Sequence, residues 1–157
     1  MVCSIIRLRR RRNHCRLPAN SYYRMHNIDL AKLLLRITCG GLLLFHGVHK
    51  VFVEVEHVKV IVRNAGLPEF MAYGNIIGEF VAPIFVLLGY QTRIAAMIIA
   101  FNMLMSVVIA HPDIAFSIND YGGWMIETNM LYMMTAVVLV FSGAGKYSLS
   151  RGEGRWD

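Results

Sequence analysis

The stretch from Ile28 to Phe52 constrains the chain most, because it is long and apolar enough to cross a bilayer yet carries charges inside. About 20 helical residues at a rise of 1.5 Å cross a hydrocarbon core of roughly 30 Å. Polar and small residues recur in it at spacings of three and four, so they share one helix face. That face consists of Lys32, Arg36, Gly40, Leu43, Gly47 and Lys50. Because such a face is costly in lipid, we expect it to contact other helices.

The composition predicts an integral membrane protein. Of the 157 residues, 56% are hydrophobic and only 17% are charged, which is too apolar for an ordinary soluble domain. The net charge of +6 is concentrated at the start, because eight of the 16 Lys and Arg residues lie in residues 1–32, at or before the beginning of the first apolar stretch. This placement indicates orientation in a membrane and no nucleic-acid partner.

Further apolar segments predict three more spans, at Phe70–Gly89, Ile94–Ala110 and Met125–Ser142. The segment after Phe52 alternates like a strand but also has a valine stripe at helical spacing. Because an isolated strand would have no sheet to join, we favour a short amphipathic helix at the membrane surface, ended by Gly66 and Pro68. The predicted fold is all-α: an integral membrane four-helix bundle with a short amphipathic helix between spans one and two.

The distribution of basic residues predicts the topology. With both termini on one side, that side holds 12 Lys and Arg residues and the other holds 3, while Arg36 lies within the membrane. Basic residues stay cytoplasmic, so both termini are expected inside. The expected organisation is a basic, disordered cytoplasmic head (1–27), a membrane domain (28–150) and a cytoplasmic tail (151–157).

The basic head has no small-residue cleavage site, so we expect the first span to remain in the protein. Met25 stands just before that span, and a second hypothesis is that residues 1–24 come from an upstream start codon. Without them the charge count is 5 against 3, which keeps the same orientation. The intact mass of the natively expressed protein distinguishes the two.

Two layers of polar residues are predicted inside the bundle. From their depth we expect Arg36 to form an ion pair with Glu79, with Asn102 as a third member. An unpaired charge at that depth costs at least about 2.5 kcal/mol on insertion scales, and pairing relieves much of it. Nearer the outside, Glu127 is expected to pair with Lys50 or His46.

Each layer allows a structural and a functional interpretation. The inner pair either fixes the register of the helices or binds a substrate. The outer group is more simply a solvated interfacial cluster in which Lys50 extends to water. His46 and His49 point in different directions around one helix and no second motif supports them, so no metal site is predicted.

The cysteines exclude one class of enzyme. Cys3 and Cys15 lie in the head and Cys39 in the first span, with no paired motif. A thiol–disulfide oxidoreductase needs such a pair, so the chain cannot be one alone. No catalytic residue is identified, and redox work would require electrons from a bound quinone or a partner.

Four short sequence patterns, in this order, resemble the DoxX family. They are LLLRITCGGLLLFHGVHKVF, GLPEF, IIGEFVAPIFVLLGYQTRIAA and GAGKYSLS, and the resemblance covers about 28–150. The matching positions are Arg36, Gly40, Gly47, Lys50, Gly66, Pro68, Glu79, Gly89, Gly143, Gly145, Tyr147 and Ser148. The closing pattern departs from the family at Ala144, often proline there, and at Ser150, often acidic.

The resemblance implies a four-helix protein of the bacterial inner membrane. The family name comes from a small subunit associated with thiosulfate:quinone oxidoreduction, and some relatives resemble parts of complexes that handle oxidative or thiol stress. A reaction carried over from fold alone has little support.

Two functional hypotheses follow. The first is a non-catalytic subunit or assembly factor of a membrane redox or stress-response complex, which contacts the bilayer and other membrane proteins or copies of itself. The second is a quinone-linked oxidoreductase component with a polar pocket around Arg36, Glu79 and His46. A pocket open to lipid beside Arg36 and Glu79 would favour the second.

Overall fold

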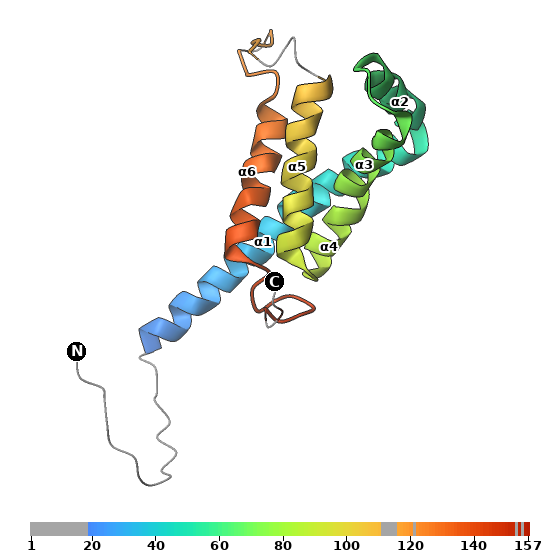
Figure 1. The fold of residues 1–157 in the computed structure, drawn as a ribbon. Coiled ribbons are helices and arrows are strands. Elements are labelled where there is room, and N and C mark those ends of the chain that lie inside the picture. Colours follow the sequence, from blue (N-terminus) through green and yellow to red (C-terminus); the bar gives the residue numbers. More distant parts are fainter. Residues whose placement is uncertain (1–18, 111–115, 121, 153, 155) are drawn as a thin grey trace, which may run out of the picture.

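The computed structural model describes residues 19–110, 116–120, 122–152, 154 and 156–157 (Figure 1). The predictions for the basic head through residue 18, for Cys3 and Cys15, and for the end of the third span at His111 lie outside these residues. Apart from one isolated bridge between Ile118 and Trp124, the described regular structure is helical, which confirms the all-α class. The helices are α1 (Ala19–His49), η1 (Lys50–Glu54), α2 (Val55–Asn64), η2 (Glu69–Met71), α3 (Ala72–Ile76), η3 (Ile77–Val81), α4 (Ala82–Leu88), α5 (Thr92–Ala110) and α6 (Glu127–Ser142).

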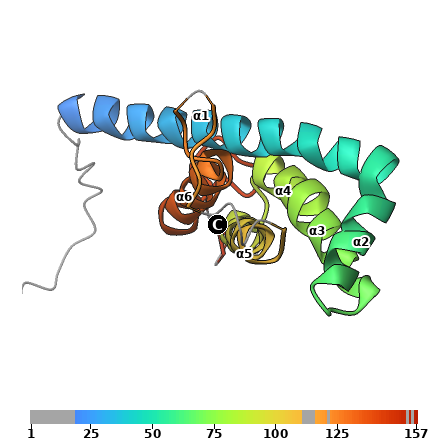
Figure 2. The ribbon, with the colours of Figure 1, turned by 90° about the horizontal axis from the view of Figure 1, so that it is seen from above.

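The long helix α1 supports the other elements. In Figure 2 it runs along one side of the molecule, with α4 and α6 packed against it and α5 beyond them. Helices α5 and α6 lie side by side, and α4 packs between α1 and α5 (Figure 1). Beyond α1 the chain turns through η1 into α2 and returns through α3, η3 and α4.

The described residues contain two helical stretches long and apolar enough to cross a membrane, Glu69–Leu88 and Thr92–Ile109. They correspond to the second and third predicted spans. Helix α6 is apolar but shorter, and α1 begins at Ala19, before the predicted start of the first span at Ile28. Large apolar side chains such as Phe45, Phe101 and Phe141 remain exposed on three helices, as expected where lipid is the solvent.

The predicted amphipathic helix is present as α2, which excludes the strand alternative. Its only buried residue is Val62. The helix ends where Gly66 adopts the left-handed conformation, with φ of 74°. The Gly66 N–H donates to Arg63 O and the Leu67 N–H to Val62 O, which closes the last turn.

The glycine face of α1 contacts neighbouring helices, as predicted. A Cβ added at Gly47 would overlap the backbone carbonyl of Glu79, and one at Gly40 would lie 3.0 Å from the Pro83 carbonyl oxygen. Gly78 in η3 likewise leaves no room for a Cβ beside Asn102. These close approaches are the reason for glycine at these positions.

The apolar core lies between α1, α4, α5 and α6. Its members share complete or nearly complete burial and come from all four helices: Cys39, Leu43, Val86, Ala96, Ile99, Ala136 and Leu139. The core fixes the relative positions of the four helices, and with them the polar side chains described next.

We expect Gly47→Ala to destabilise the fold by about 1–3 kcal/mol, because the new methyl group must displace the backbone of η3. The thermal midpoint of the detergent-solubilised protein measures the effect. Gly41→Ala is the matched control, since a Cβ at Gly41 meets nothing within 4 Å. Equal midpoints for the two variants would contradict the proposed close packing.

Candidate functional site

Arg36 is buried inside the bundle, with 1% of its surface exposed, but the predicted ion pair with Glu79 is wrong. Its guanidinium donates hydrogen bonds to four backbone carbonyls instead. Nε donates to Val86 O at 2.8 Å and Nη2 to Leu87 O at 2.7 Å. Nη1 donates to Ala144 O at 3.1 Å and to Tyr147 O at 2.8 Å.

The end of α4 explains why carbonyls replace the carboxylate. The last carbonyls of a helix lack partners within the helix and carry partial negative charge. Helix α4 ends before Gly89, whose φ of 69° turns the chain, and the segment after α6 brings further carbonyls to the same point. A guanidinium has five N–H donors and can satisfy several of these acceptors at once. Arg36 therefore joins α1 to the ends of α4 and α6 and has a structural role.

Glu79 has a different cation as its partner. Its side chain is 4% exposed, and its Oε1 accepts from Lys50 Nζ at 2.7 Å. The Asn102 amide donates to the same Oε1 at 3.4 Å and to Asn75 Oδ1 at 3.0 Å. Three predicted site residues, Lys50, Glu79 and Asn102, are thus brought together, in a combination that the sequence analysis did not propose.

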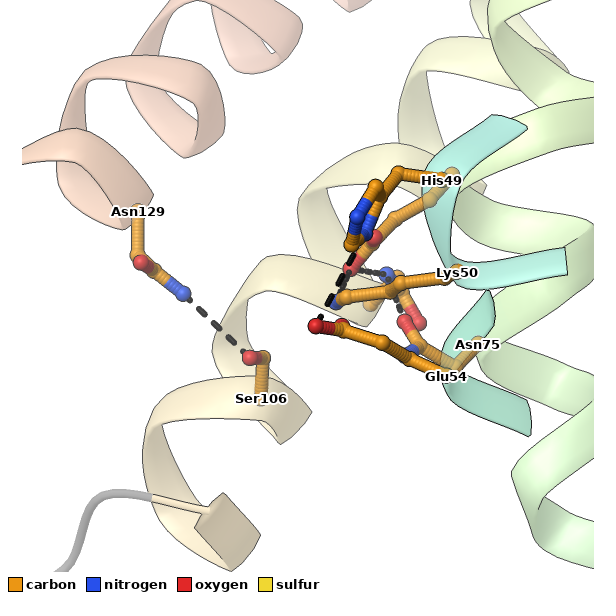
Figure 3. A network of polar contacts seen from close by, with 8 residues as sticks. His49, Lys50, Glu54, Asn75, Ser106 and Asn129 are labelled. Carbon is orange, nitrogen blue, oxygen red and sulfur yellow. Dashed lines mark hydrogen bonds and ion pairs between the residues drawn. The ribbon is translucent and has the colours of Figure 1, made fainter. Parts of the chain in front are cut away.

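Asn75 completes this cluster, which we call the Lys50–Glu79 cluster (Figure 3). Asn75 is not among the site residues predicted from the sequence. A signal was present, because Asn75 and Glu79 are four residues apart and therefore share a helix face.

Both charged members of the cluster lie in π-helical turns. Lys50 begins η1, and Glu79 lies within η3, where the Ala82 N–H donates to the Ile77 carbonyl five residues back. Pro83 follows η3 and has no N–H for the Glu79 carbonyl four residues before it. The wider turn changes the direction in which the Glu79 side chain points, and such turns are frequent at functional sites.

The predicted outer pairing of Glu127 with Lys50 or His46 is also wrong. Lys50 binds Glu79, and the exposed His46 ring packs edge-on against Tyr132 with centroids 6.1 Å apart. Glu127 is exposed near Gly123. At the surface, His49 Nδ1 lies 3.7 Å from Glu54 Oε1. Among the described residues no three His, Cys, Asp or Glu side chains gather as metal ligands do.

A cavity of about 680 Å³ lies beside the cluster, between α2, α3, η3 and α5. The residues predicted to line a pocket, Arg36, Glu79 and His46, do not line this cavity. Its polar lining residues are Lys50, Glu54, His57, Tyr73, Asn75, Asn102 and Ser106. The rest of the wall is largely apolar and includes Val58, Ile61, Phe70, Ile98, Phe101 and Met105. Phe70 and Phe101 are well exposed, so the cavity opens at the outer surface of the helices.

The wall of α5 carries a second polar contact. Ser106, which lines the cavity, accepts a hydrogen bond from Asn129 of α6 at 3.3 Å. Figure 3 shows this pair apart from the Lys50–Glu79 cluster. The pair links α5 to α6 and thereby fixes one wall of the cavity.

The second carboxylate oxygen of Glu79, Oε2, is buried and has no hydrogen-bond partner among the described residues. A buried acceptor without a partner is costly, and such groups frequently mark sites that receive a ligand. The charged residues Lys50 and Glu54 line the cavity and have opposite charges. The cavity therefore suits an uncharged polar head attached to an apolar body.

Comparison with known proteins agrees with the sequence resemblance. The model of the DoxX family matches residues 31–112, which include Arg36, Lys50, Glu79 and Asn102. The chain is 26% identical over 118 residues to the protein named "Putative oxidoreductase CatD" of Bacillus subtilis (strain 168). The match covers 75% of this chain and 83% of that protein. No solved structure matches the chain significantly.

We expect Arg36→Met to lower the free energy of unfolding by about 3 kcal/mol, because buried carbonyls lose their charged donor. Thermal unfolding in detergent measures the loss. Arg63→Gln is the control, since Arg63 is exposed and pairs only with the exposed Glu69. Wild-type stability of the Arg36 variant would contradict the structural role.

The Lys50–Glu79 ion pair predicts that the effects of substituting its two members on stability do not add. Lys50→Met should destabilise by about 1–3 kcal/mol, because it leaves the buried Glu79 carboxylate without its cation. Adding Glu79→Leu should restore part of that loss, since no charge is then left unpaired. A double-mutant cycle on thermal midpoints checks this, and additive losses would count against the pair.

Proposed function

Because the chain belongs to the DoxX family, we propose that it is a multi-pass inner-membrane component of a redox or stress-response complex, and that its cavity binds a quinone. The single observation that carries the proposal is the Lys50–Glu79 ion pair, in which Glu79 is buried and the half-buried Lys50 lines a largely apolar cavity. A quinone has the matching chemistry, since its carbonyl oxygens accept hydrogen bonds and its tail is apolar.

The dimensions support this assignment. A volume of about 680 Å³ falls within the range of roughly 300–1,000 Å³ typical of small-molecule pockets. The tail would lie along Ile61, Ile98 and Phe101, and the head would reach Lys50 and Asn75. The opening at the outer surface of the helices would let a quinone enter from lipid.

The polar groups could assist reduction of the head. A quinone becomes a quinol by taking up two electrons and two protons. Lys50 would hydrogen-bond a carbonyl and donate a proton to the oxygen as negative charge develops on it. Glu79, which accepts from Lys50 Nζ, would take up a proton from water and return it to Lys50. Arg36 takes no part, because its N–H groups already bind backbone carbonyls.

The electrons would come from a partner. Cys39 is the one cysteine among the described residues and is buried, so thiol exchange within this part of the chain has no second sulfur. The name of the similar Bacillus subtilis protein, "Putative oxidoreductase CatD", agrees with a redox setting for this chain.

The alternative is a non-catalytic subunit or assembly factor, in which the polar residues only hold the helices together. The contacts of Arg36 favour this alternative, because its buried guanidinium donates its hydrogen bonds to backbone carbonyls of the same chain. The glycine-lined helix faces give this alternative less support, because Gly40, Gly47 and Gly78 contact helices of the same chain and not a partner protein. Docking to other membrane proteins or to a second copy would need another surface.

We propose four spans with both termini in the cytoplasm. The ratio of 12 to 3 basic residues supports this orientation. The arrangement in Figure 1 agrees with it, because the end of α6, the start of α5 and the last residue lie together, away from α2. The cavity would then lie toward the extracytoplasmic side.

We expect Glu79→Gln to preserve the folded yield and to lower quinone-dependent turnover at least about tenfold, because the amide cannot carry the proton. Turnover of decylubiquinone is measured in membranes that contain the native complex. Loss of folded protein with normal turnover per folded molecule would instead support the structural alternative.

Filling the cavity tests binding separately. Ile98→Trp should remove most of the thermal stabilisation that decylubiquinone gives the purified protein, because Ile98 lines the cavity. Val138→Trp on α6 is the matched control at a position that is half exposed and outside the cavity. Equal stabilisation of both variants would overturn the assignment of the quinone to this cavity.

A further inference from the structure

A second cleft, of about 370 Å³, lies at the other end of the helices from the cavity. It is formed by the first half of α1, the start of α5 and the segment after α6. Its charged residues are Asp29, Lys32, Arg93, Lys146, Arg151 and Asp157, and we call it the charged cleft.

The cations of the charged cleft are in excess and largely unpaired. Its side chains carry four positive and two negative charges. Arg93 already donates from Nε to the main-chain oxygen of Asp157 at 3.0 Å. Both carboxylates already accept backbone hydrogen bonds: Asp29 from the Lys146 N–H at 3.3 Å, and Asp157 from the Thr92 N–H at 3.2 Å. Within the part of the chain that the structure describes, the charged groups of Lys32, Lys146 and Arg151 form no ion pair.

A neutral donor lies in the same wall. The Ser142 hydroxyl lines the charged cleft, and its oxygen is buried without a hydrogen-bond partner among the described residues. Gly145, with φ of 75°, holds the loop close to α1, because a Cβ there would meet Lys32 Cδ at 3.0 Å. The backbone thus keeps the cations of α1 and of the loop next to each other.

We propose that the charged cleft binds a phosphate group, carried by an anionic phospholipid or by a free phosphate compound. Phosphate oxygens accept several charge-assisted hydrogen bonds from lysine and arginine side chains. Basic pockets at the cytoplasmic ends of membrane helices are suited to lipid headgroups. Phe141 and Leu149 are strongly exposed and lie within two residues, in the sequence, of Ser142 and Arg151, which line the cleft. They would offer apolar surface to the acyl chain of a lipid.

This site does not depend on the quinone assignment, because it uses different residues at the opposite end of the helices. Its occupant would join α1, α5 and the segment after α6 through one anion. Hydrogen bonds already connect these elements, because Arg36 of α1 donates to Ala144 O after α6 and Asp157 accepts from the Thr92 N–H at the start of α5.

Native mass spectrometry of the purified full chain in an uncharged detergent tests the proposal. The probes are phosphatidylglycerol, diacylglycerol with the same acyl chains, and inorganic phosphate. We expect phosphatidylglycerol to bind at least about tenfold more tightly than diacylglycerol, which lacks the phosphate. Lys146→Gln with Arg151→Gln should reduce that binding about tenfold, because two of the three cations without an ion pair are removed.

The matched control is Lys59→Gln with Arg63→Gln, which removes the same charge from α2 at the far end. Should the double variant in the cleft fold poorly, Lys146→Gln alone at its exposed position provides the test.

Binding of inorganic phosphate that competes with the lipid would identify a general phosphate site. Lipid binding without phosphate binding would identify a headgroup site. Equal binding of both lipids, or equal loss in the cleft and control variants, would overturn the proposal.

Discussion

The structure depends on how two buried charges are satisfied in an apolar bundle. A charge removed from water and left unpaired would cost more than most single contacts contribute. Arg36 meets this constraint with backbone carbonyls, and Glu79 meets it with Lys50. The two solutions have different consequences. The first uses the donors of the guanidinium, whereas the second leaves Glu79 Oε2 without a hydrogen-bond partner among the described residues and places Lys50 in the wall of a cavity.

Helical periodicity made much of the fold predictable. The three-and-four spacing of Gly40 and Gly47 identified the packing face of α1, and the valine stripe identified α2. The burial of Arg36, Glu79 and Asn102 was likewise predictable, since polar residues within long apolar segments seldom face lipid. These inferences need only the local pattern, and they do not require knowledge of which helices are neighbours.

The partners of the buried charges were not predictable by the same reasoning. A rise of 1.5 Å per residue gives the depth of a side chain in the membrane only for a regular α-helix. The π-helical turns η1 and η3 depart from that geometry at Lys50 and Glu79. The acceptors of Arg36 are backbone carbonyls, which every residue has, so no side-chain pattern marks them. Their availability depends on where α4 ends and on the path of the segment after α6, which are properties of the tertiary structure.

Gly47, Glu79 and Pro83 together explain why the carboxylate is placed beside the cavity. Pro83 has no N–H for the Glu79 carbonyl, so the regular helical bond at that point is missing and a π-helical turn takes its place. The same carbonyl approaches Gly47 so closely that no side chain fits between α1 and η3. Lys50, almost one turn beyond Gly47, is thereby brought to the Glu79 side chain. The packing of two backbones thus determines the position of the ion pair, and any larger residue at 47 would separate its members.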